Sequence, residues 1–426
     1  MVTGILKQVI KWLFLSVAAC LAVVAALIGT FVADLAVSGA LFGGDYPKRL
    51  ATHSDSSVKD VSYFPGRAIK TGRRSALPSS GRIDNPLPGS ALTARLSGGA
   101  NEGIVDLGRF LDAHDTTGFV ILKDGRVLYE HYPPGLDRSS LQTSFSVSKS
   151  VTSMLIGAAI QDGLIRSVDA PIADYLPDYP ALRASHVTIR DLLTMRSGLS
   201  YDRTRPLWIF SAPWDDDTLT YWAPNLRRLC ARERPVREPG TTFEYNDYHP
   251  LLLGLVLERV THMSVSNYLQ NRLWRPLGME FEASWSLDSV DDGFEKMESG
   301  LNARTIDFTK LGQLMLDGGR WHGSQLLPTA WVAQSTTPPP APRSYIGAQP
   351  DGLAAPGGFY AFMWWGLPTR DGATDFYADG KFGQYIYVSK VNGVVIVRNG
   401  RSEGKLAFWP ALLRDIADRA ALVQTH

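Results

Sequence analysis

Cysteine is scarce in this chain of 426 residues, which contains only Cys20 and Cys230. Cys20 lies inside an apolar run near the N-terminus, so we expect no intrachain disulfide framework. The eight histidines are scattered, and no Cys/His pair has the spacing of zinc ligands. The sequence therefore predicts no structural zinc site, and it implies neither a metal nor an organic cofactor.

An excess of charge of either sign is also missing. The chain has 43 Lys and Arg residues against 42 Asp and Glu residues, a formal net charge of +1. A nearly neutral protein has no general electrostatic attraction to a phosphate backbone. The densest basic cluster, Arg73 and Arg74 close to Lys70, falls in a polar stretch. We expect no nucleic-acid partner.

Charged residues are absent from Trp12 to Ala33, close to the N-terminus. As a helix, these 22 residues would be about 33 Å long, enough for a hydrocarbon core of about 30 Å. Lys7 and Lys11 precede the run, which places the N-terminus in the cytoplasm. We predict a transmembrane anchor over residues 1–35, with the membrane as a partner and the rest of the chain extracytoplasmic, in the periplasm if the source is Gram-negative. A cleavable signal peptide is the alternative.

The rest of the sequence has enough apolar residues for a large core. Hydrophobic residues make up 45% of the chain and aromatic residues 10%, which predicts one large domain or two closely associated ones. Residues 36–100 are rich in Gly, Pro, Ser and Arg, and we interpret them as a tether that partly wraps the domain. The domain itself is expected to comprise residues 101–426.

Two hairpin patterns flank the predicted domain. Apolar and polar residues alternate on both sides of Asp124-Gly125, and again around Val391-Asn-Gly393. Helical patterns dominate between them, from about 150 to 320. The predicted fold is α+β: an antiparallel sheet from about 101–135 and 360–400, flanked by helices, whose first and last strands meet, with a helical insertion.

The most informative short motif is Ser146-Val-Ser-Lys149, which opens a helical pattern. Side chains at i and i+3 share a helix face, so Lys149 would lie beside the Ser146 hydroxyl. The first helical turn also offers unpaired backbone N–H groups and the positive end of the helix dipole. A basic neighbour and N–H donors are what an acyl-transfer nucleophile needs.

The same motif has a plain structural interpretation. Ser146 could cap the helix while Lys149 is exposed, which is the commoner case for an isolated Ser-x-x-Lys sequence. Ser56-Ser-Val-Lys59 has the same spacing, but it lies in the predicted tether and no apolar helix follows it. We interpret that second motif as structural, and the spacing alone does not decide the role of the first.

Longer stretches of the sequence favour a catalytic role for Ser146-Val-Ser-Lys149. At this point the chain resembles the serine β-lactamase and penicillin-binding-protein superfamily, whose Ser-x-x-Lys motif opens a buried helix. The resemblance extends from about Gly118 to Arg398, through SVDAPIADYLPDY, VTIRDLLTMRSGLS and PGTTFEYNDYHPLLLGLVLERVT. Within the superfamily the chain is most similar to the class C β-lactamase-like branch of esterases and 6-aminohexanoate-dimer hydrolases, through EASWSLD, ESGLNARTIDFTKLGQLMLDGG and GQYIYV.

The resemblance implies roles for residues of the first two motifs. The first motif makes Ser146 the nucleophile and Lys149 its activating neighbour. The second motif, Tyr-x-Asn in class C enzymes, matches Tyr245-Asn-Asp247. Tyr245 would be the proton shuttle, a phenol whose pKa must be lowered by adjacent cations before it acts as a base. Asp247 replaces the usual amide, which puts recognition of an acylamino side chain in doubt.

The third motif, Lys-Thr-Gly in the β-lactamases, aligns with Ala378-Asp-Gly380. The lysine and threonine that bind the β-lactam carboxylate are lost, so we do not expect efficient β-lactam hydrolysis. The resemblance implies that the N–H of Lys381 donates to the oxyanion beside that of Ser146. Gly380, Lys381 and Asp247 are therefore the expected oxyanion and substrate-binding residues.

Other residues offer competing or auxiliary roles. Gly400-Arg-Ser-Glu-Gly404 matches a nucleophile elbow, but only 22 residues follow it, too few for the rest of a triad, so we interpret it as a turn. His249 and Glu244 lie near Tyr245 in sequence and are candidates for tuning it. Trp364-Trp365 is a candidate pocket lining.

The combined prediction is a serine hydrolase that cleaves an ester or amide of a small molecule through a Ser146 acyl-enzyme. The predicted type is an esterase or a 6-aminohexanoate-oligomer amidase. Two alternatives stay open. One is a D-amino-acid peptidase or β-lactamase acting on cell-wall-like substrates, and the other is a penicillin-binding sensor that acylates without turnover.

Overall fold

The computed structural model describes most of the chain, in two compact units. The described residues are 8, 10–26, 28–29, 43, 45–53, 55–80, 92–183, 185–203, 215–347, 350–369 and 372–423. One unit comprises Met1–Asp55 with Asp202–Asn225, and the other comprises Ser56–Tyr201 with Leu226–His426. All three motifs of the predicted site belong to the second, larger unit.

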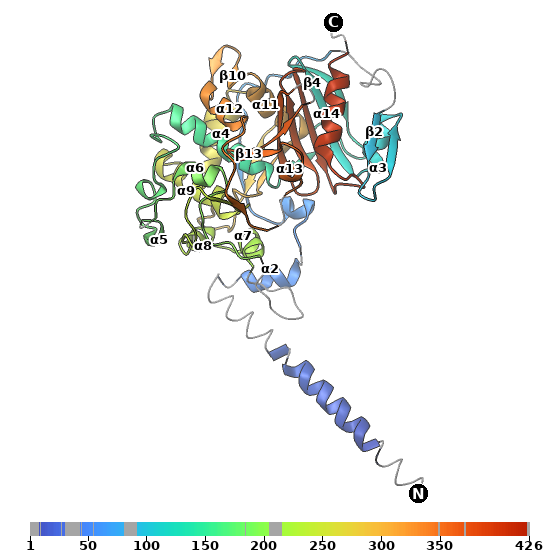
Figure 1. The fold of residues 1–426 in the computed structure, drawn as a ribbon, viewed down its shortest axis with the longest axis vertical. Coiled ribbons are helices and arrows are strands. Elements are labelled where there is room, and N and C mark those ends of the chain that lie inside the picture. The colour runs from blue at the N-terminus through green and yellow to red at the C-terminus, as the bar shows by residue number, and fades with distance from the viewer. Residues whose placement is uncertain are drawn as a thin grey trace. The chain divides into compact units, whose positions relative to one another are not determined.

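A seven-stranded antiparallel sheet forms the core of the larger unit (Figure 1). Its strands, in sheet order, are β13 (Phe359–Ala361), β14 (Trp364–Pro368), β15 (Thr374–Gly380), β16 (Gln384–Ser389), β17 (Val394–Gly400), β4 (Thr116–Lys123) and β5 (Arg126–His131). Because β17 pairs with β4, strands from the two ends of the domain meet. The predicted α+β fold, with an antiparallel sheet flanked by helices, is confirmed.

Both predicted hairpins are part of this sheet. Asp124 and Gly125 join β4 to β5 with φ angles of 50° and 73°, the left-handed conformation that a two-residue hairpin turn requires. The second hairpin joins β16 to β17, and Gly393 at its turn has a φ of 61°. Every residue of β17 is buried, as expected for a central strand covered on both faces.

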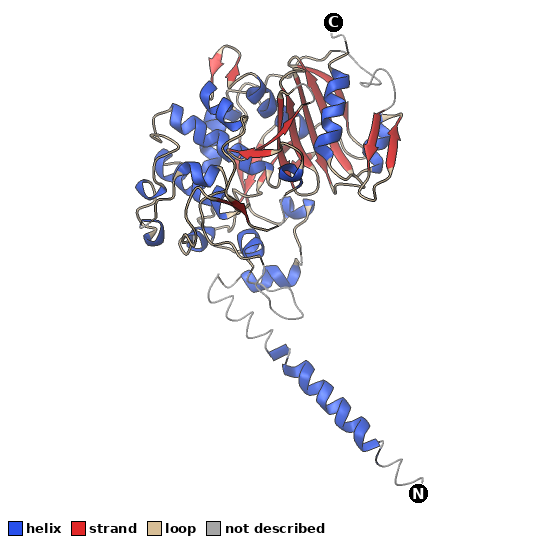
Figure 2. Ribbon diagram, viewed as in Figure 1, coloured by secondary structure: helices blue, strands red, loops and turns tan. Residues whose placement is uncertain are grey.

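Helices cover both faces of the sheet (Figure 2). On one face α11 (Thr305–Leu316) packs so closely that a Cβ at Gly312 would meet Ile386 and Val395 side chains at 2.9 Å and 2.6 Å. Because side chains alternate along a strand, Tyr385 and Tyr387 point to the opposite face. That face is covered by α14 (Trp409–Ala420), with the short α13 (Asp351–Ala354) beside β13 and β14.

The helical part of the larger unit surrounds two buried helices, α4 (Val147–Gln161) and α9 (Tyr248–Thr261), which pack against each other. The other elements are η2 (Ile172–Asp174), α5 (Pro180–Arg183), α6 (Ile189–Leu193), α8 (Leu226–Cys230), α10 (Val265–Leu269), the π-helix η3 (Gln270–Trp274), α12 (Thr329–Ser335), and the short strands β7 (Thr242–Phe243), β10 (Arg320–Trp321), β11 (Ser324–Gln325) and β12 (Ser344–Tyr345).

Part of the predicted tether is built into the larger unit. Its elements are η1 (Val58–Ser62), β1 (Gly66–Ile69) and β2 (Leu92–Arg95). β1 joins a four-stranded sheet in the order β1-β8-β9-β6, with β8 (Ala283–Ser286), β9 (Leu301–Arg304) and β6 (Leu141–Thr143). β2 pairs with β3 (Asn101–Ile104), which α3 (Leu107–Ala113) follows.

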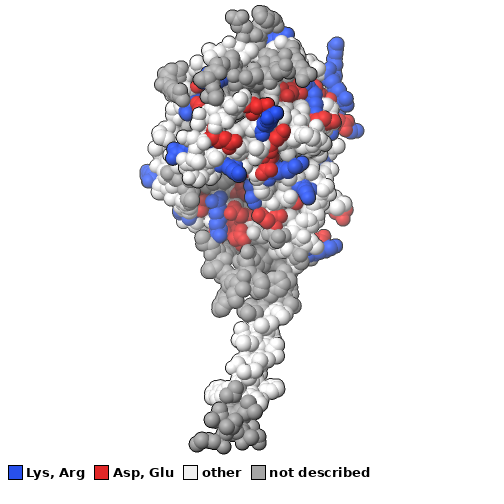
Figure 3. Space-filling view, turned by 90° about the vertical axis from the view of Figure 1, so that its right-hand side faces the viewer, with Lys and Arg blue, Asp and Glu red and all other residues white. Residues whose placement is uncertain are grey.

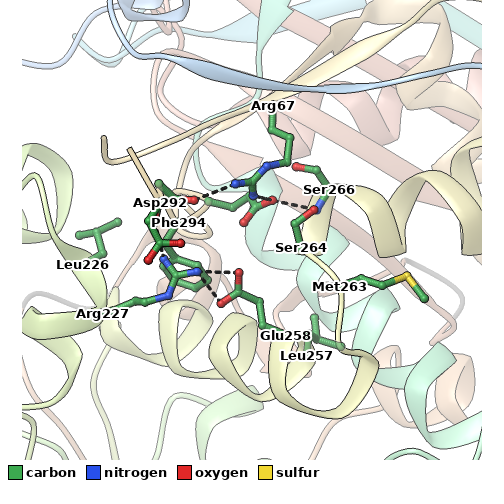
Figure 4. A network of polar contacts seen from close by, with 12 residues as sticks. Arg67, Leu226, Arg227, Leu257, Glu258, Met263, Ser264, Ser266, Asp292 and Phe294 are labelled. Atoms are coloured by element: carbon green, nitrogen blue, oxygen red, sulfur yellow. Dashed lines mark hydrogen bonds and ion pairs between the residues drawn. The ribbon is translucent and has the colours of Figure 1, made fainter. Parts of the chain in front are cut away.

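A polar network fastens β1 to the helical part (Figure 4). Arg67 of β1 donates to the Glu295 carboxylate at 2.6 Å and to the Gly293 carbonyl at 2.9 Å. The Glu295 side chain is fully buried and also accepts the Ser266 N–H at 3.0 Å. β1 is therefore held by a buried ion pair as well as by its strand pairing.

The smaller unit contains α2 (Tyr46–Thr52) and α7 (Asp216–Trp222), which contact each other. Residues 10–26 and 28–29 are also helical. The predicted transmembrane segment lies partly outside the described residues, since 27 and 30–33 are not among them. Across the described part of the chain, no helix is both long enough and apolar enough to span a bilayer.

Candidate active site

Ser146 lies at the junction of β6 and α4 in the larger unit, where it is half-buried. It occupies the N-cap position of α4, after Phe145, which has a left-handed φ of 45°. The Ser144 N–H donates to the Leu301 carbonyl at 2.9 Å, and the Ser144 and Ser148 hydroxyls hydrogen-bond at 2.8 Å. These contacts fix the strained turn. No side-chain cap hydrogen bond is formed by Ser146, so its hydroxyl is not used as a helix cap.

The ammonium group of Lys149 lies against the Ser146 hydroxyl. Lys149 is 1% exposed, and its Nζ donates to Ser146 Oγ at 2.7 Å. The same Nζ donates to the Glu298 carbonyl at 2.9 Å and lies 2.9 Å from Asp247 Oδ1. The alternative of an exposed Lys149 is therefore wrong: the residue is buried and its contacts point it at Ser146.

Tyr245 completes the group from the segment that leads into α9. The Ser146 hydroxyl interacts with its phenol and favours the ionised form, and Lys149 Nζ lies 5.0 Å from its ring centroid. Trp365 stacks on the Tyr245 ring at 5.8 Å, and Tyr360 meets its edge at 6.0 Å. The aromatic packing holds the phenol in place, so Ser146, Lys149 and Tyr245 converge as the sequence predicts.

The electrostatics of the group differ from the expectation. Burial raises the pKa of Tyr245; the Lys149 charge opposes that rise and Asp247 adds to it. Burial alone would lower the pKa of Lys149, but the charges of Asp247 and Tyr245 outweigh burial and raise it. The expectation of a lowered Tyr245 pKa is thus wrong for the free protein, chiefly because burial outweighs the lowering effect of the Lys149 charge, and Asp247 adds to the rise.

Asp247 is oriented inward, toward Lys149. It is the N-cap residue of α9, and its side chain keeps 21% of its surface exposed. An amide at this position would accept a hydrogen bond from Lys149 without neutralising its charge. The carboxylate that replaces the usual amide therefore changes the electrostatics of Lys149 as well as the recognition of the substrate.

Gly380, at the end of β15, approaches the Ser146 backbone closely. A Cβ added there would lie 2.3 Å from the Ser144 carbonyl oxygen and 3.2 Å from the Ser146 nitrogen. Only glycine permits this approach. The Lys381 side chain turns away from the site and donates to Ser56 Oγ at 2.6 Å, so a contribution of Lys381 to an oxyanion site would come from its backbone N–H.

The auxiliary candidates fall outside this group, with one exception. His249 bonds to Ser197 at 2.6 Å, and burial lowers its pKa to about 3, while Glu244 pairs with Arg237. Trp364 packs on Phe376 away from the site, whereas Trp365 contacts Tyr245. Trp365 thus lies against the catalytic group, while the lining of a pocket by either tryptophan stays a prediction.

The serines of the two motifs that we interpret as structural have structural partners. Ser402, of the elbow-like sequence, donates to Asp115 at 2.5 Å in the turn before α14. In the tether motif, Ser57 caps η1 and accepts the Lys59 N–H, while Ser56 binds Lys381. Both interpretations as structural residues agree with these contacts.

Two features of the site were missed by sequence reasoning. The Glu298 carbonyl positions Lys149, and a backbone acceptor leaves no signal in residue identity. The carboxylate of Asp379, in the third motif, lies within electrostatic reach of Lys149 and Tyr245. The sequence did contain a sign of this feature, because Asp379 occupies the position of the threonine in the Lys-Thr-Gly motif of β-lactamases.

Comparisons with known proteins agree with the geometry. A family model described as "Beta-lactamase" matches residues 108–420. The chain is 26% identical over 315 residues to the 6-aminohexanoate-dimer hydrolase of Paenarthrobacter ureafaciens, covering 72% of this chain and 76% of that protein. It is 27% identical over 204 residues to penicillin-binding protein 4 of Amycolatopsis lactamdurans, covering 46% of this chain and 45% of that protein.

Solved structures share the fold. A candidate 6-aminohexanoate-dimer hydrolase of Bacillus anthracis superposes with a TM-score of 0.67 at 20% identity, over 84% of this chain and 91% of its own. EstCE1, a hydrolase with promiscuous acyltransferase activity, superposes with a TM-score of 0.56 at 16% identity, over 74% and 96%.

Proposed function

The chain belongs to the beta-lactamase family, whose model spans residues 108–420, and from that premise we propose that it is a serine hydrolase acting through an acyl-enzyme on Ser146. The resemblance predicted from the sequence is thereby confirmed, and with it the assignment as a hydrolase. The observation that carries the finer proposal is the contact of Ser146 Oγ with Lys149 Nζ at 2.7 Å, beside the Tyr245 phenol, whose ionised form both residues favour.

Acylation begins when Tyr245, as a phenolate, accepts the Ser146 proton while Oγ attacks the substrate carbonyl carbon. The Lys149 ammonium stabilises the phenolate from 5.0 Å away. The oxyanion that develops is held by the backbone N–H groups of Ser146 and Lys381. The Tyr245 hydroxyl then protonates the leaving alcohol or amine, which leaves an ester on Ser146 and a phenolate on Tyr245.

Deacylation uses the same groups in reverse. Tyr245 accepts a proton from the incoming water, whose oxygen attacks the ester carbonyl carbon of the acyl-enzyme. The collapsing intermediate expels Ser146, which recovers its proton from Tyr245. The two half-reactions consume one water and return each side chain to its starting state.

The substrate class follows from the third motif and from the related hydrolase. Without the lysine and threonine of the β-lactamase motif, the site lacks the groups that would bind a β-lactam carboxylate. The Paenarthrobacter relative is, by its name, a hydrolase of 6-aminohexanoate dimer. We therefore infer small esters and linear amides as substrates, with cell-wall peptides as the second candidate because a penicillin-binding protein is also related.

The decisive experiment is mass spectrometry of the full chain after brief exposure to p-nitrophenyl esters, 6-aminohexanoate dimer, a D-Ala-D-Ala peptide and nitrocefin, with turnover followed in parallel. We expect a transient adduct on Ser146, and loss of turnover by roughly 10³-fold or more in Ser146→Ala. Ser402→Ala and Ser56→Ala are matched controls that keep turnover. Rapid hydrolysis by Ser146→Ala would refute the assignment, and an adduct that never clears would indicate a sensor.

The location is a further part of the proposal. The uncharged run from Trp12 to Ala33, with Lys7 and Lys11 before it, supports an N-terminal membrane anchor and an extracytoplasmic catalytic domain. Sedimentation with membranes, and digestion of the domain by protease added outside spheroplasts, is the expected result. A protease-protected domain would contradict it.

A further inference from the structure

A second buried ion pair lies next to Lys149, in the turn at residues 296–300 that leads into β9. Lys296 Nζ is 2.9 Å from Glu298 Oε1, and each of the two side chains is only 2% exposed. Phe294 and Met297 beside them are buried too. The pair is therefore shielded from solvent, and no step of the proposed reaction uses its charges.

The bonds of the pair fix the shape of this turn. Glu298 Oε1 accepts a hydrogen bond from Ser299 Oγ at 2.8 Å in addition to its contact with Lys296. The Lys296 carbonyl accepts the Gly300 N–H at 2.7 Å and the Trp285 indole N–H at 2.9 Å. Because both ends of the turn bond to Lys296 or Glu298, the peptide of Glu298 is held in one orientation.

The Glu298 peptide presents its carbonyl to Lys149. Lys149 Nζ donates to that carbonyl at 2.9 Å, and its other contacts are Ser146 Oγ at 2.7 Å and Asp247 Oδ1 at 2.9 Å. Ser146 becomes an ester during the reaction, and the Asp247 side chain is partly exposed. The Glu298 carbonyl is thus the acceptor that is both buried and unchanged by the chemistry.

The residue after the turn holds the backbone on either side of the nucleophile. The Leu301 N–H donates to Ser148 Oγ at 3.0 Å, and the Leu301 carbonyl accepts the Ser144 N–H at 2.9 Å. Residues 298–301 therefore contact the start of α4 on both sides of Ser146 and again at Lys149. A shift of this turn would change where Lys149 lies relative to Ser146.

Stability alone does not account for charges at this place. Replacing a buried ion pair with apolar residues of similar volume is often neutral for stability, so packing does not require Lys296 and Glu298. Their bonds are directional, and Lys296 Nζ also lies 4.6 Å from the Phe64 ring centroid. Directional bonds select one conformation of the turn, which apolar contacts do not.

We propose that Lys296 and Glu298 are positioning residues for acyl transfer. Their ion pair holds the Glu298 carbonyl against Lys149 and thereby keeps the ammonium beside Ser146 and Tyr245. The inference rests on the proposed function and adds two residues that support its catalytic group. Since neither residue touches the substrate, their loss should lower kcat and leave KM nearly unchanged.

The test removes the pair as a whole from the full-length protein. Lys296→Met combined with Glu298→Met takes away both charges, so neither is left buried without its partner. Lys149 and Tyr245 act in both half-reactions, so with a p-nitrophenyl ester we expect kcat to fall about 30-fold or more and KM to change less than about 2-fold. The melting temperature shows that the variant is folded.

A conservative variant should rescue the reaction. Glu298→Gln keeps the oxygen to which Lys296 and Ser299 bond. The other carboxylate oxygen of Glu298 has no hydrogen-bond partner among the described residues, so its replacement by an amide nitrogen breaks no bond. We expect kcat within about 5-fold of the wild-type value.

The pH dependence distinguishes a displaced Lys149 from a weakened fold. The Lys149 charge opposes the burial that raises the pKa of Tyr245. A more distant ammonium opposes it less, so in the double variant the rising limb of the kcat/KM profile should move to higher pH by about 0.5 pH unit. The pair carries no net charge, so the shift reports the position of Lys149. Partial unfolding would lower the rates without moving the limb.

The matched control is Arg227→Met combined with Glu258→Met. This change removes another ion pair, 2.8 Å long and shown in Figure 4, which forms no bond with Lys149 in the described part of the chain. Its kcat and pH profile should match those of the wild type. If the double variant at Lys296 and Glu298 also kept the wild-type kcat and rising limb, the pair would be structural only and the proposal would be wrong.

Labelling by a fluorophosphonate separates this proposal from the proposed function. In that reaction Ser146 Oγ displaces fluoride from phosphorus, so the labelling rate measures activation of Ser146 without ester turnover. The double variant should be labelled about 30-fold more slowly than the wild type. Equal labelling rates would refute the positioning role alone. A wild-type chain that is labelled but hydrolyses no ester would refute the hydrolase, and a slower double variant would still support the role. If the wild type showed neither reaction, both proposals would be wrong.

Discussion

At the scale of single residues, the unusual feature is Asp247, a carboxylate within 2.9 Å of the buried Lys149 ammonium. Burial is the main cause of the raised pKa of Tyr245, and the charge of Asp247 adds to it; the same charge raises the pKa of Lys149 against the effect of burial. A base must be deprotonated to work, so raising its pKa moves the active range toward alkaline pH. The free protein therefore holds its catalytic group in a protonated, resting state.

Asp247→Asn should shift the rising limb of the kcat/KM profile to lower pH by about one pH unit. The amide keeps a hydrogen-bond acceptor for Lys149 while removing the charge, so the pKa of Tyr245 falls. The measurement is a pH–rate profile with a p-nitrophenyl ester from pH 6 to 10. The control is Asp169→Asn, which removes a carboxylate from an exposed pair with Arg190 and should leave the profile unchanged. If the rising limb of the Asp247→Asn profile lay at the wild-type pH, the catalytic base would not be coupled to Asp247.

At the scale of elements, β1 shows how a segment far from the site supports it. β1 pairs with β8, β8 with β9, and β9 with β6, which leads directly into Ser146. The buried pair of Arg67 and Glu295 fastens this sheet at its outer edge (Figure 4). Loss of the pair would thus loosen the strands behind the nucleophile.

Arg67→Met should destabilise the protein by about 3–5 kcal/mol, because Glu295 would remain buried without its cation. The free energy of unfolding in urea measures the loss. Arg67→Met combined with Glu295→Met should recover much of it, since the uncompensated charge is removed. If the single and double variants were equally unstable, strand packing rather than the ion pair would be what fastens β1.

The elements also show what the sequence could and could not predict. Asp124-Gly125 and the alternating strands around it predicted the hairpin, because turn chemistry and side-chain alternation are local properties. β1 was interpreted as tether, because four residues of strand carry too little pattern to reveal a partner more than 200 positions away. The convergence of Ser146, Lys149 and Tyr245 came from family resemblance, and the pairing of Lys149 with Asp247 needed the structure.

At the scale of the whole molecule, burial raises the pKa of several carboxyl groups by more than their hydrogen bonds and ion pairs lower it. Burial raises the pKa of Asp307 and Asp375 to about 6, of Glu258 to about 7 and of Asp379 to about 8. On the face shown in Figure 3, Lys and Arg are interspersed with Asp and Glu. Protonation of these few buried groups, not surface charge, should therefore dominate the acid side of the stability profile.

The free energy of unfolding should fall as pH rises from about 5 to 8. The folded-state pKa values of these carboxyl groups are raised, so the folded chain binds more protons than the unfolded chain in this window, and stability is lost as they dissociate. A pKa difference of two corresponds to about 3 kcal/mol as an upper bound for one group. Urea midpoints at pH 5 to 8 measure the slope; Asp375→Asn should flatten it, and a rising midpoint would contradict it.

The pairing of β17 with β4 also has a consequence during synthesis. Lys123 is in register with Val394 and Gly118 with Asn399, so β4 leaves the ribosome long before its partner exists. Until then β4 presents an open strand edge, which invites pairing with other chains. We expect nascent chains to need protection by a chaperone, and the site around Ser146 to form only after the last strand has been made.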